Sequence, residues 1–443
     1  MDRGRRQGPR RRQCRVAVAA AQLALMALAV SACGQQVLTG YVADQVSVVG
    51  YSDLDGRPGF KLAIKEVNGR WYLYMGHLWH RGWTIVDVTD PARPTVAKFV
   101  PGPDNTWTIQ MDLHDDIMIT ALQGFSKEWG ADPDKPFDEG VLIWDISDPV
   151  NPTQLGHFKT GGRGTHRNQY PGGQYMHLAA NMPGYQGQIY VIVDISDPAN
   201  PTEAGRWWVP GQHTAGGETS SENYSIHGPP HIAGNRAYLP YQAAGMIILD
   251  ISDVSKPTLI GQLDFNPPFR GAVHTVVPIP ERQLAYTNSE AIAESCAEPL
   301  NQASLVDISD PSKPRLVSIF PVPEPPGGSP YADFCDKGGR FGPHNVNQNL
   351  HSPDVEPQGD LIYLTYFNAG LRIYNIADPE QPREVGYFIP PDPQERIGPI
   401  PVEKLVVQTE DVLVDRRGYI YITGKNEGLW ILRYNRPGSE PTQ

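Results

Sequence analysis

The chain has 443 residues, of which 40% are hydrophobic and 19% are charged, and its formal net charge at pH 7 is −12. An acidic protein repels the phosphate backbone, so nucleic acid is not an expected partner. The length alone would predict two or three domains, but a repeat within the chain argues for one.

The first 32 residues have the pattern of a signal peptide that is removed from the mature protein. Residues 1–15 contain seven arginines and one aspartate, and an apolar stretch follows that is too short for a comfortable membrane span. This stretch ends in Val30-Ser31-Ala32-Cys33, which resembles a bacterial lipobox and implies acylation of Cys33. An ordinary signal peptide that ends near a cysteine is the alternative.

Removal of this segment leaves 30 basic and 48 acidic residues, and a formal net charge of −18. We therefore expect an exported protein of the bacterial cell envelope, anchored to a membrane by lipid and exposed on the periplasmic or cell-surface side. A membrane, bound through this lipid anchor, is therefore one expected partner.

One phrase recurs along the rest of the chain: an apolar run that ends at an aspartate and continues into an Asp-Pro turn. The clear copies end their apolar runs at Asp87, Asp145, Asp194, Asp250, Asp307 and Asn375, and a decayed seventh copy reaches Arg433. Neighbouring copies are 49 to 68 residues apart. Seven units of this length predict a repeat architecture.

Each unit is predicted to contain four short antiparallel strands. In the copy "HIAGNRAYLPYQAAGMIILDISD", a Gly-Asn turn joins the first two strands, and "MIILD" forms the third. The Asp-Pro turn leads into the fourth strand. Seven such units with few helical stretches predict an all-β protein, a seven-bladed β-propeller.

The two ends of the chain are predicted to meet in the last blade. No apolar fourth strand follows Tyr434, whereas Val46–Tyr51 has the pattern of one. An N-terminal strand in this place closes the ring and removes an exposed sheet edge. The predicted organisation is a signal peptide at 1–32, a lipid tether at 33–45, the propeller at 46–435 and a tail at 436–443.

The repeated phrase resembles the LVIVD repeat, in copies such as "YVIVDISDPANP" and "VLIWDISDPVNP". The resemblance covers nearly the whole mature chain, although the second unit departs from the usual spacing and the seventh has lost its Asp-Pro turn. It implies an exported bacterial protein with a propeller fold. It implies almost nothing about activity, because function on a shared fold depends on individual sites.

Two cysteines remain in the mature chain besides Cys33. Cys296 and Cys335 both lie in loop sequence rich in Pro and Gly. Export to an oxidising compartment favours one disulfide between them.

The longest connections are predicted to leave the propeller on one face. Connections between second and third strands, and between successive blades, share this face, and the long ones span 123–140, 210–226, 290–303, 321–343 and 390–408. Long loops on a rigid scaffold commonly carry binding sites. We therefore expect the ligand or partner, a small molecule or a protein, to bind on this loop-rich face.

Four histidines recur where the first strand of a blade begins, at the mouth of the central channel. Across the seven blades this position holds Lys61, Trp107, His166, His227, His274, His344 and Glu410. Imidazole is the commonest metal ligand, so the four histidines predict a site for iron, copper or zinc. By arrangement alone, this resembles the four-histidine iron centre of carotenoid oxygenases. Histidines that bind water or have a structural role are the alternative.

A second set of polar residues follows the second strand of each blade: His77, Gln123, Asn181, Gln242, Glu290, Asn368 and Asn426. These side chains are expected to orient the imidazoles or a ligand, with Glu290 and Glu410 as the charge-balancing partners. The other histidines are weaker candidates (His213, His231, His351) or ordinary strand and turn residues (His80, His114, His157, His177).

Two functions remain open from the sequence. One is a surface binding or scaffold module, for which Trp79, Trp107, Trp129 and Tyr331 would offer an aromatic patch. The other is a metal-dependent enzyme, such as an oxidoreductase, with its four-histidine centre at the channel mouth. The acidic run with Asp132, Asp134, Asp138 and Glu139 lacks EF-hand spacing and is predicted to be a solvated loop rather than a calcium site.

Overall fold

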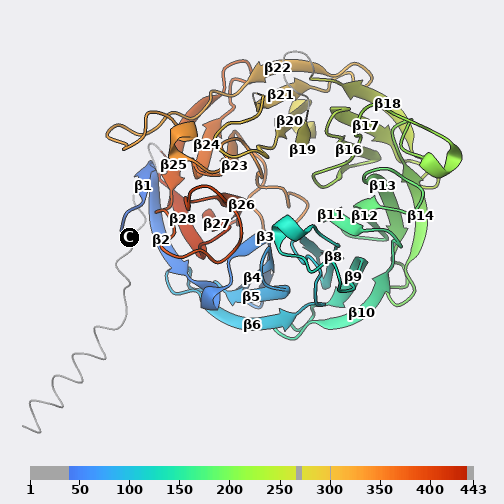
Figure 1. The fold of residues 1–443 in the computed structure, drawn as a ribbon, viewed down its shortest axis with the longest axis horizontal. Helices are drawn as coiled ribbons and strands as arrows, with labels where there is room; N and C mark the ends of the chain where they lie inside the picture. The colour runs from blue at the N-terminus through green and yellow to red at the C-terminus, as the bar shows by residue number, and fades with distance from the viewer. Residues whose placement is uncertain (1–38, 266–271, 300, 437–443) are drawn as a thin grey trace, which may run out of the picture. The chain divides into compact units, whose positions relative to one another are not determined.

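Seven antiparallel sheets of four strands each surround a common axis in the computed structural model (Figure 1). The structure describes residues 39–265, 272–299 and 301–436, and the sheets belong to one unit that starts at Val42. This arrangement confirms the predicted seven-bladed β-propeller. Among the described residues, no helix is long and apolar enough to cross a bilayer.

Five blades take their four strands from consecutive parts of the chain. Blade one consists of β3 (Gly59–Val67), β4 (Arg70–His77), β5 (Gly82–Asp87) and β6 (Thr95–Pro101), and blade two of β7 (Met111–His114), β8 (Ile117–Leu122), β9 (Gly140–Asp145) and β10 (Thr153–Phe158). Blade three consists of β11 (Gly164–Gln169), β12 (Tyr175–Asn181), β13 (Ile189–Asp194) and β14 (Thr202–Trp207), and blade four of β15 (His231–Ala233), β16 (Arg236–Pro240), β17 (Met246–Asp250) and β18 (Thr258–Leu263). Blade five consists of β19 (Val273–Ile279), β20 (Leu284–Ser289), β21 (Ala303–Asp307) and β22 (Arg315–Ile319).

Short helical turns interrupt the connections. They are η1 (Leu54–Gly56), η2 (Lys127–Trp129), η3 (Thr214–Gly216), η4 (Pro280–Arg282) and the four-residue α2 (Phe334–Lys337).

The N-terminal strand closes the ring, as predicted. Blade seven consists of β26 (Thr409–Val414), β27 (Tyr419–Gly424), β28 (Leu429–Tyr434) and, on its outer edge, β2 (Val46–Ser52). Strand β2 runs antiparallel to β28, with Val48 opposite Leu432. Backbone groups that β28 would otherwise expose are paired in this way.

Blade six departs from the predicted arrangement. Its sheet contains β23 (Leu361–Thr365), β24 (Leu371–Asn375) and β25 (Arg383–Ile389), and the short strand β1 (Val42–Asp44) pairs with β25 at the outer edge. On the axis side, only an isolated bridge between Val346 and Leu364 replaces a regular inner strand. The predicted tether at 33–45 therefore ends too late, because residues from Val42 onward already pair with the edge of a blade.

The repeated phrase builds both the turn and the contact between blades. In six units the side chain of the recurrent Asp or Asn accepts a hydrogen bond of 2.7 to 2.9 Å from the backbone N–H two residues later. The fourth strand then bulges before a glycine, and a Cβ at Gly205 would overlap the carbonyl oxygen of Val254 in the next blade's turn. Gly50, Gly156 and Gly261 face the same turn of their neighbours.

The hydrophobic core lies between neighbouring sheets. One cluster joins Tyr190 and Ile192 of blade three to Leu239 and Leu249 of blade four, and all four side chains are fully buried. Strands that are buried on both faces explain the nearly continuous apolar runs of the repeat.

Candidate functional site

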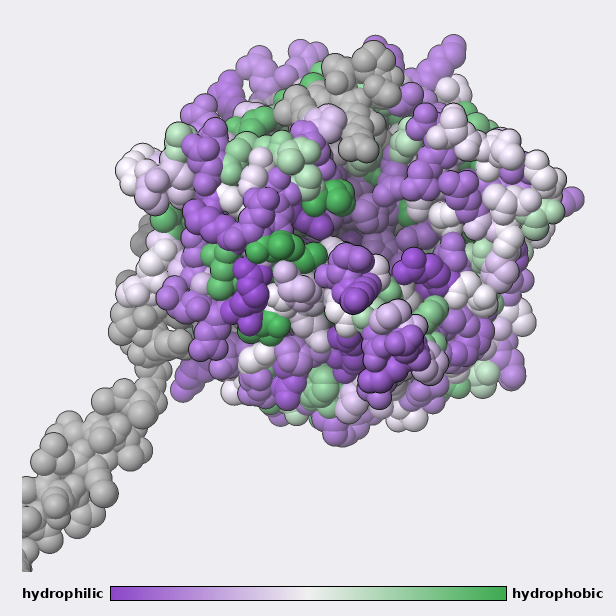
Figure 2. All heavy atoms as spheres, viewed as in Figure 1, coloured by the Kyte–Doolittle hydropathy of each residue, from purple (hydrophilic) through white to green (hydrophobic). Residues whose placement is uncertain are grey.

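The five longest connections leave the same face of the propeller, between second and third strands or between blades. Near the axis on this face lies a pocket of about 220 Å³, which we call the axial pocket. Its lining combines apolar side chains (Phe60, Leu78, Trp107, Ile109, Trp129, Ile292) with polar ones (His166, Arg167, His227, Glu290, Arg340, His344, Glu410, Lys425). The two kinds pack against each other, as Phe60 does against His344 and Arg167, and Trp129 against Arg340. In the view of Figure 2, hydrophilic side chains cover most of the surface, and hydrophobic ones gather beside a central depression.

The four predicted histidines form an arc around the axis. Ring centroids are 5.0 Å apart between His166 and His227, and 4.9 Å apart both between His227 and His274 and between His274 and His344. All four come from the predicted position at the start of blades three to six. His166 and His274 are the extra residues of β-bulges in β11 and β19, which turn these side chains toward the axis.

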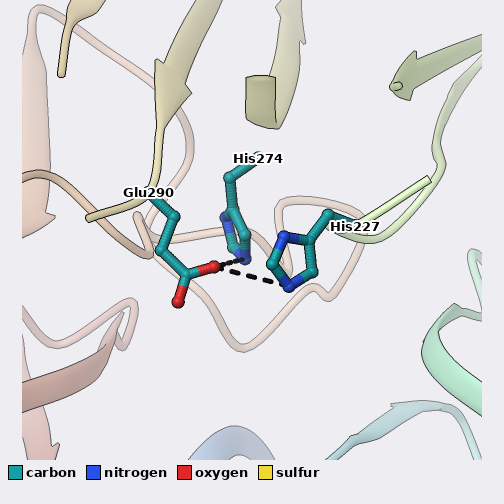
Figure 3. A group of neighbouring side chains, drawn as sticks. All are labelled: His227, His274 and Glu290. Carbon is teal, nitrogen blue, oxygen red and sulfur yellow. Dashed lines mark ion pairs between the residues drawn. The ribbon is translucent and has the colours of Figure 1, made fainter. Parts of the chain in front are cut away.

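Glu290 stands where three of the imidazoles converge. Its Oε2 lies 3.4 Å from Nε2 of His227 and 3.6 Å from Nε2 of His274, and its Oε1 lies 3.7 Å from Nε2 of His344. Figure 3 shows His227 and His274 directed at the same carboxylate. Among the described residues, His227, His274 and Glu290 place one ligand atom each within 4.8 Å of one another. Glu290 was expected as a charge-balancing partner of the imidazoles, and its side chain lies beside their Nε2 atoms.

A neighbouring group contacts the other ring nitrogen, Nδ1, of each histidine. Nδ1 of His166 lies 2.7 Å from Oε1 of Gln123, and Nδ1 of His344 lies 2.9 Å from the backbone oxygen of Glu410. The corresponding distances are 3.0 Å from His227 to the amide nitrogen of Gln242 and 2.8 Å from His274 to the hydroxyl of Thr275. His166, His227 and His344 line the pocket, whereas His274 is fully buried behind its lining. Nε2 of His166 is buried and has no hydrogen-bond partner.

Burial keeps the histidines neutral. Desolvation lowers the pKa of His166, His274 and His344 well below the usual 6.5, and it also lowers the pKa of His227. Neutral imidazole is the form that binds metal ions.

Burial by itself raises the pKa of the Glu290 carboxyl. The neighbouring imidazoles, when protonated, and the guanidinium groups of Arg340 and Arg167 lower this pKa below its usual range and favour the carboxylate. The site therefore offers neutral nitrogens together with one carboxylate.

Three cations that the sequence pattern did not predict line the pocket. Nη1 of Arg340 lies 3.2 Å from Oε1 of Glu290, and Lys425 forms an ion pair with Glu410. Nη2 of Arg167 lies 3.4 Å from Nε2 of His274. Coordination of a metal by His274 would therefore require this guanidinium to move.

The sequence carries a usable signal for only one of these three cations. Arg167 directly follows His166, and strict strand alternation would point the two side chains to opposite faces. Arg340 lies in an insertion between blades, and Lys425 is adjacent to the predicted Asn426. Only the position of Lys425, at the end of a second strand, was within reach of the repeat pattern.

Of the three remaining residues of the first predicted set, two line the axial pocket and one does not. Trp107 and Glu410 line the axial pocket. Lys61 lies away from it, because Nζ bonds to Oε1 of Gln348 at 3.1 Å and pairs with Asp411 at 3.4 Å. The bulge at the start of β3 places Phe60 in the pocket wall instead.

The second predicted set has two roles. Gln123 and Gln242 contact imidazoles, as described. Asn181, Asn368 and Asn426 instead hydrogen-bond to loop backbone: to Gly187, to Phe334 and Gly338, and to 397–400, respectively. His77 is fully buried inside blade one, between the oxygen of Pro58 and the hydroxyl of Thr84. These four side chains hold loop backbone or lie inside a blade, and none of these hydrogen bonds reaches an imidazole of the arc.

The aromatic residues pack on one another rather than forming an open patch. Trp79 stacks on Trp129 at 5.8 Å, and Trp107 stacks on Phe125 at 5.1 Å. Tyr331 packs against Phe334, far along the chain from these tryptophans. Trp107 and Trp129 thus contribute a wall to the axial pocket.

The acidic run of blade two is explained by local bonds. Asp138 pairs with Lys159, and the carboxylate of Glu139 accepts hydrogen bonds from the backbone of Thr160 and Gly161. The weaker candidate His351 lies 3.3 Å from Asp112.

Cys296 and Cys335 form the expected disulfide, with their Cα atoms 5.4 Å apart. The bond joins the connection that carries Glu290 to the connection that carries Arg340. Backbone contacts run beside it, since the N–H of Ser295 donates to the oxygen of Gly339 at 2.8 Å.

The blades and their axial pocket define this protein as a seven-bladed β-propeller with a polar site at one end of its axis. Comparison with solved structures agrees: a β-propeller domain of Cps50 (Swd1) from Myceliophteria thermophila aligns with 87% of this chain and 99% of its own, at a TM-score of 0.54 and 11% identity. The designed protein Ika8 aligns with 87% of this chain and 98% of its own, at a TM-score of 0.47 and 8% identity.

Within that class, five segments of the chain are similar to the LVIVD repeat. The family model of this repeat matches residues 71–100, 136–160, 185–208, 231–264 and 301–321, which lie in blades one to five. This match confirms the similarity of the repeated phrase to the LVIVD repeat. No curated protein matches the sequence.

Proposed function

We propose that this propeller is a cell-envelope binding protein whose axial pocket holds a transition-metal ion, iron, copper or zinc, as part of its ligand site. The observation that supports the proposal is the convergence of three Nε2 atoms on the carboxylate of Glu290. His227, His274 and Glu290 would form the core of the ligand set, and His344 would complete it.

The distances favour a metal over direct hydrogen bonds. Hydrogen bonds between imidazole and carboxylate are about 2.7 to 3.2 Å long. Two ligands that each bind zinc at about 2.1 Å in tetrahedral geometry are about 3.4 Å apart. The separations of Oε2 of Glu290 from His227 and His274, 3.4 and 3.6 Å, are near the second value, and Oε1 lies 3.7 Å from His344.

Metal analysis of the purified protein tests the proposal. After equilibration with each of the three metals and removal of the excess, wild type should retain about one ion per chain. His274→Ala and Glu290→Gln should lose it. His213→Ala is the matched control, because this imidazole lies on the same face but stacks on Tyr185. Equal metal content in all four proteins, or none in wild type, would overturn the proposal.

A metal-dependent enzyme is the second candidate, favoured by the position of the axial pocket directly beside these ligands. Catalysis requires a coordination position that an outside molecule can occupy. In protein loaded with Co²⁺, addition of azide should change the visible absorption spectrum if such a position exists. An unchanged spectrum would leave only the binding role.

The envelope location of this site is also part of the proposal. Cys33 and the signal peptide lie outside the described residues, so the support is the lipobox sequence. Cys33→Ala should move the protein from the membrane fraction to the soluble fraction. Retention in the membrane fraction, with no lipid on the N-terminal peptide, would contradict lipid anchoring.

A further inference from the structure

Arg167 is a buried cation whose charge is not matched by an ion pair. Its residue is 3% exposed, and it lines the axial pocket. Nη1 bonds to the amide oxygen of Gln110 at 3.1 Å, and Nη2 contacts His274, whereas the buried Nε has no partner. Among the described residues, no carboxylate lies within 4.0 Å of it. Burial of a guanidinium without a counter-charge is unfavourable.

The other charged groups around Arg167 are already paired. Two acids act on its charge, Glu290 and Asp411, and each has another cation: Arg340 for Glu290 and Lys61 for Asp411. Of the three cations in the lining, Arg340 pairs with Glu290 and Lys425 pairs with Glu410, so Arg167 is left as an excess positive charge. A divalent metal at His274 and Glu290 would increase that excess, so the pocket favours an anion.

The apolar side chains of the pocket limit which anion fits. Phe60 and Ile109 line the pocket and are otherwise buried, and the guanidinium of Arg167 lies beside Phe60, 5.2 Å from its ring centroid. Trp129 adds an aromatic face, and the pocket of about 220 Å³ is small for a ligand site. An inorganic anion would leave this apolar part of the lining unused.

We propose that the axial pocket binds a small carboxylic acid with an aromatic or aliphatic body. Its carboxylate pairs with Arg167, since guanidinium and carboxylate match in a two-bond geometry. Its body packs against Phe60, Ile109 and Trp129. The proposal rests on the proposed function, because it concerns the ligand of the same pocket. The contact between the carboxylate and Arg167 does not require the metal.

The contact between Arg167 and His274 couples the two ligands. A guanidinium that donates to Nε2 of His274 blocks the lone pair that a metal would use. The carboxylate offers Arg167 a stronger acceptor and frees this nitrogen. Each ligand should therefore raise the affinity of the other by the same factor.

Calorimetric titration of the full mature chain with benzoate tests this inference. Benzamide has nearly the same shape without the charge, so it should bind at least about tenfold more weakly. Arg167→Gln should weaken benzoate by about tenfold or more, and Arg167→Lys should weaken it less. Arg93→Gln, which removes an exposed arginine on the Asp-Pro turn of blade one, should leave it unchanged.

A thermal melt accompanies each variant. A ligand-binding role predicts that Arg167→Gln leaves the melting temperature unchanged or higher, because it removes a buried charge. Equal binding of benzoate and benzamide, no benzoate binding to wild type, or unchanged benzoate affinity in Arg167→Gln would each overturn the inference.

Titrations of metal-free and metal-loaded protein separate the two proposals. Benzoate that binds metal-free protein in an Arg167-dependent way supports the carboxylate site even if the metal analysis fails. A bound metal without benzoate affinity overturns the carboxylate site and leaves the metal site standing.

Discussion

Removal of the disulfide should loosen the axial pocket as well as the fold. Cys296 follows Glu290 by six residues and Cys335 precedes Arg340 by five, so the bond closes a loop between the two members of a buried ion pair. The cysteines are 39 residues apart. In the chain-entropy treatment, a loop of this length stabilises the folded state by about 4 kcal/mol, because the bond restricts the unfolded chain.

The double variant Cys296→Ser/Cys335→Ser measures this effect. Its free energy of unfolding in urea should fall by about 4 kcal/mol, or by less if this part of the propeller unfolds separately. Its metal content under limiting metal should also fall, because Glu290 and Arg340 lose a covalent restraint. Wild type under reducing conditions is the matched control and should behave in the same way.

A double variant that keeps both the unfolding free energy and the metal content of wild type would contradict the predicted role of the disulfide. That result would mean that the backbone contacts beside the bond, between Ser295 and Gly339, hold the two connections without covalent help. A loss of stability with unchanged metal content would restrict the role of the disulfide to the fold.

Two further predictions concern the fold. Burial raises the pKa of Glu427 to about 8, so this carboxyl is protonated in the folded protein below that pH, and stability should fall as pH rises from about 4.5 to 8. Glu427→Gln should remove this slope and stabilise the protein by about 4 kcal/mol at pH 8, measured by urea unfolding at several pH values. Gly205→Ala should lower the unfolding free energy by about 1 to 3 kcal/mol, since its Cβ would meet the backbone of Val254. Gly327→Ala is the control and should leave the unfolding free energy unchanged, because no atom lies within reach of its Cβ. Equal effects of the two substitutions would contradict the contact between blades.

The fold was accessible to sequence reasoning because one phrase encodes a strand, a capped turn and a second strand. The hydrogen bonds from Asp194 and its equivalents hold that turn in six units. Strand β1 was missed because Val42–Asp44 is too short to show a pattern and forms only by pairing with β25. The irregular inner edge of blade six was missed because a bridge at Val346 has no sequence signature.

The candidate site was accessible in part for the same reason. Counting back from the second strand located the four histidines, because each blade begins its inner strand at a similar distance. Counting residues in this way could not predict Arg167, because a bulge at His166 breaks the alternation of side chains on which the count depends. It could not predict Arg340 either, because that residue enters the site from an insertion fixed by Cys335.

The bulges also explain how a repeat can carry a site that is not repeated. Blades one, three, five and seven share a bulge at the start of the inner strand, with Phe60, His166, His274 and Glu410 at or beside it. A bulged residue is released from strand pairing, so its side chain is not needed for the sheet or for the core between blades. Its identity can then follow the ligand rather than the fold. An apolar Phe60 among polar bulge residues such as His166 and Glu410 gives the pocket both apolar and charged lining, as the proposed apolar carboxylic acid would require.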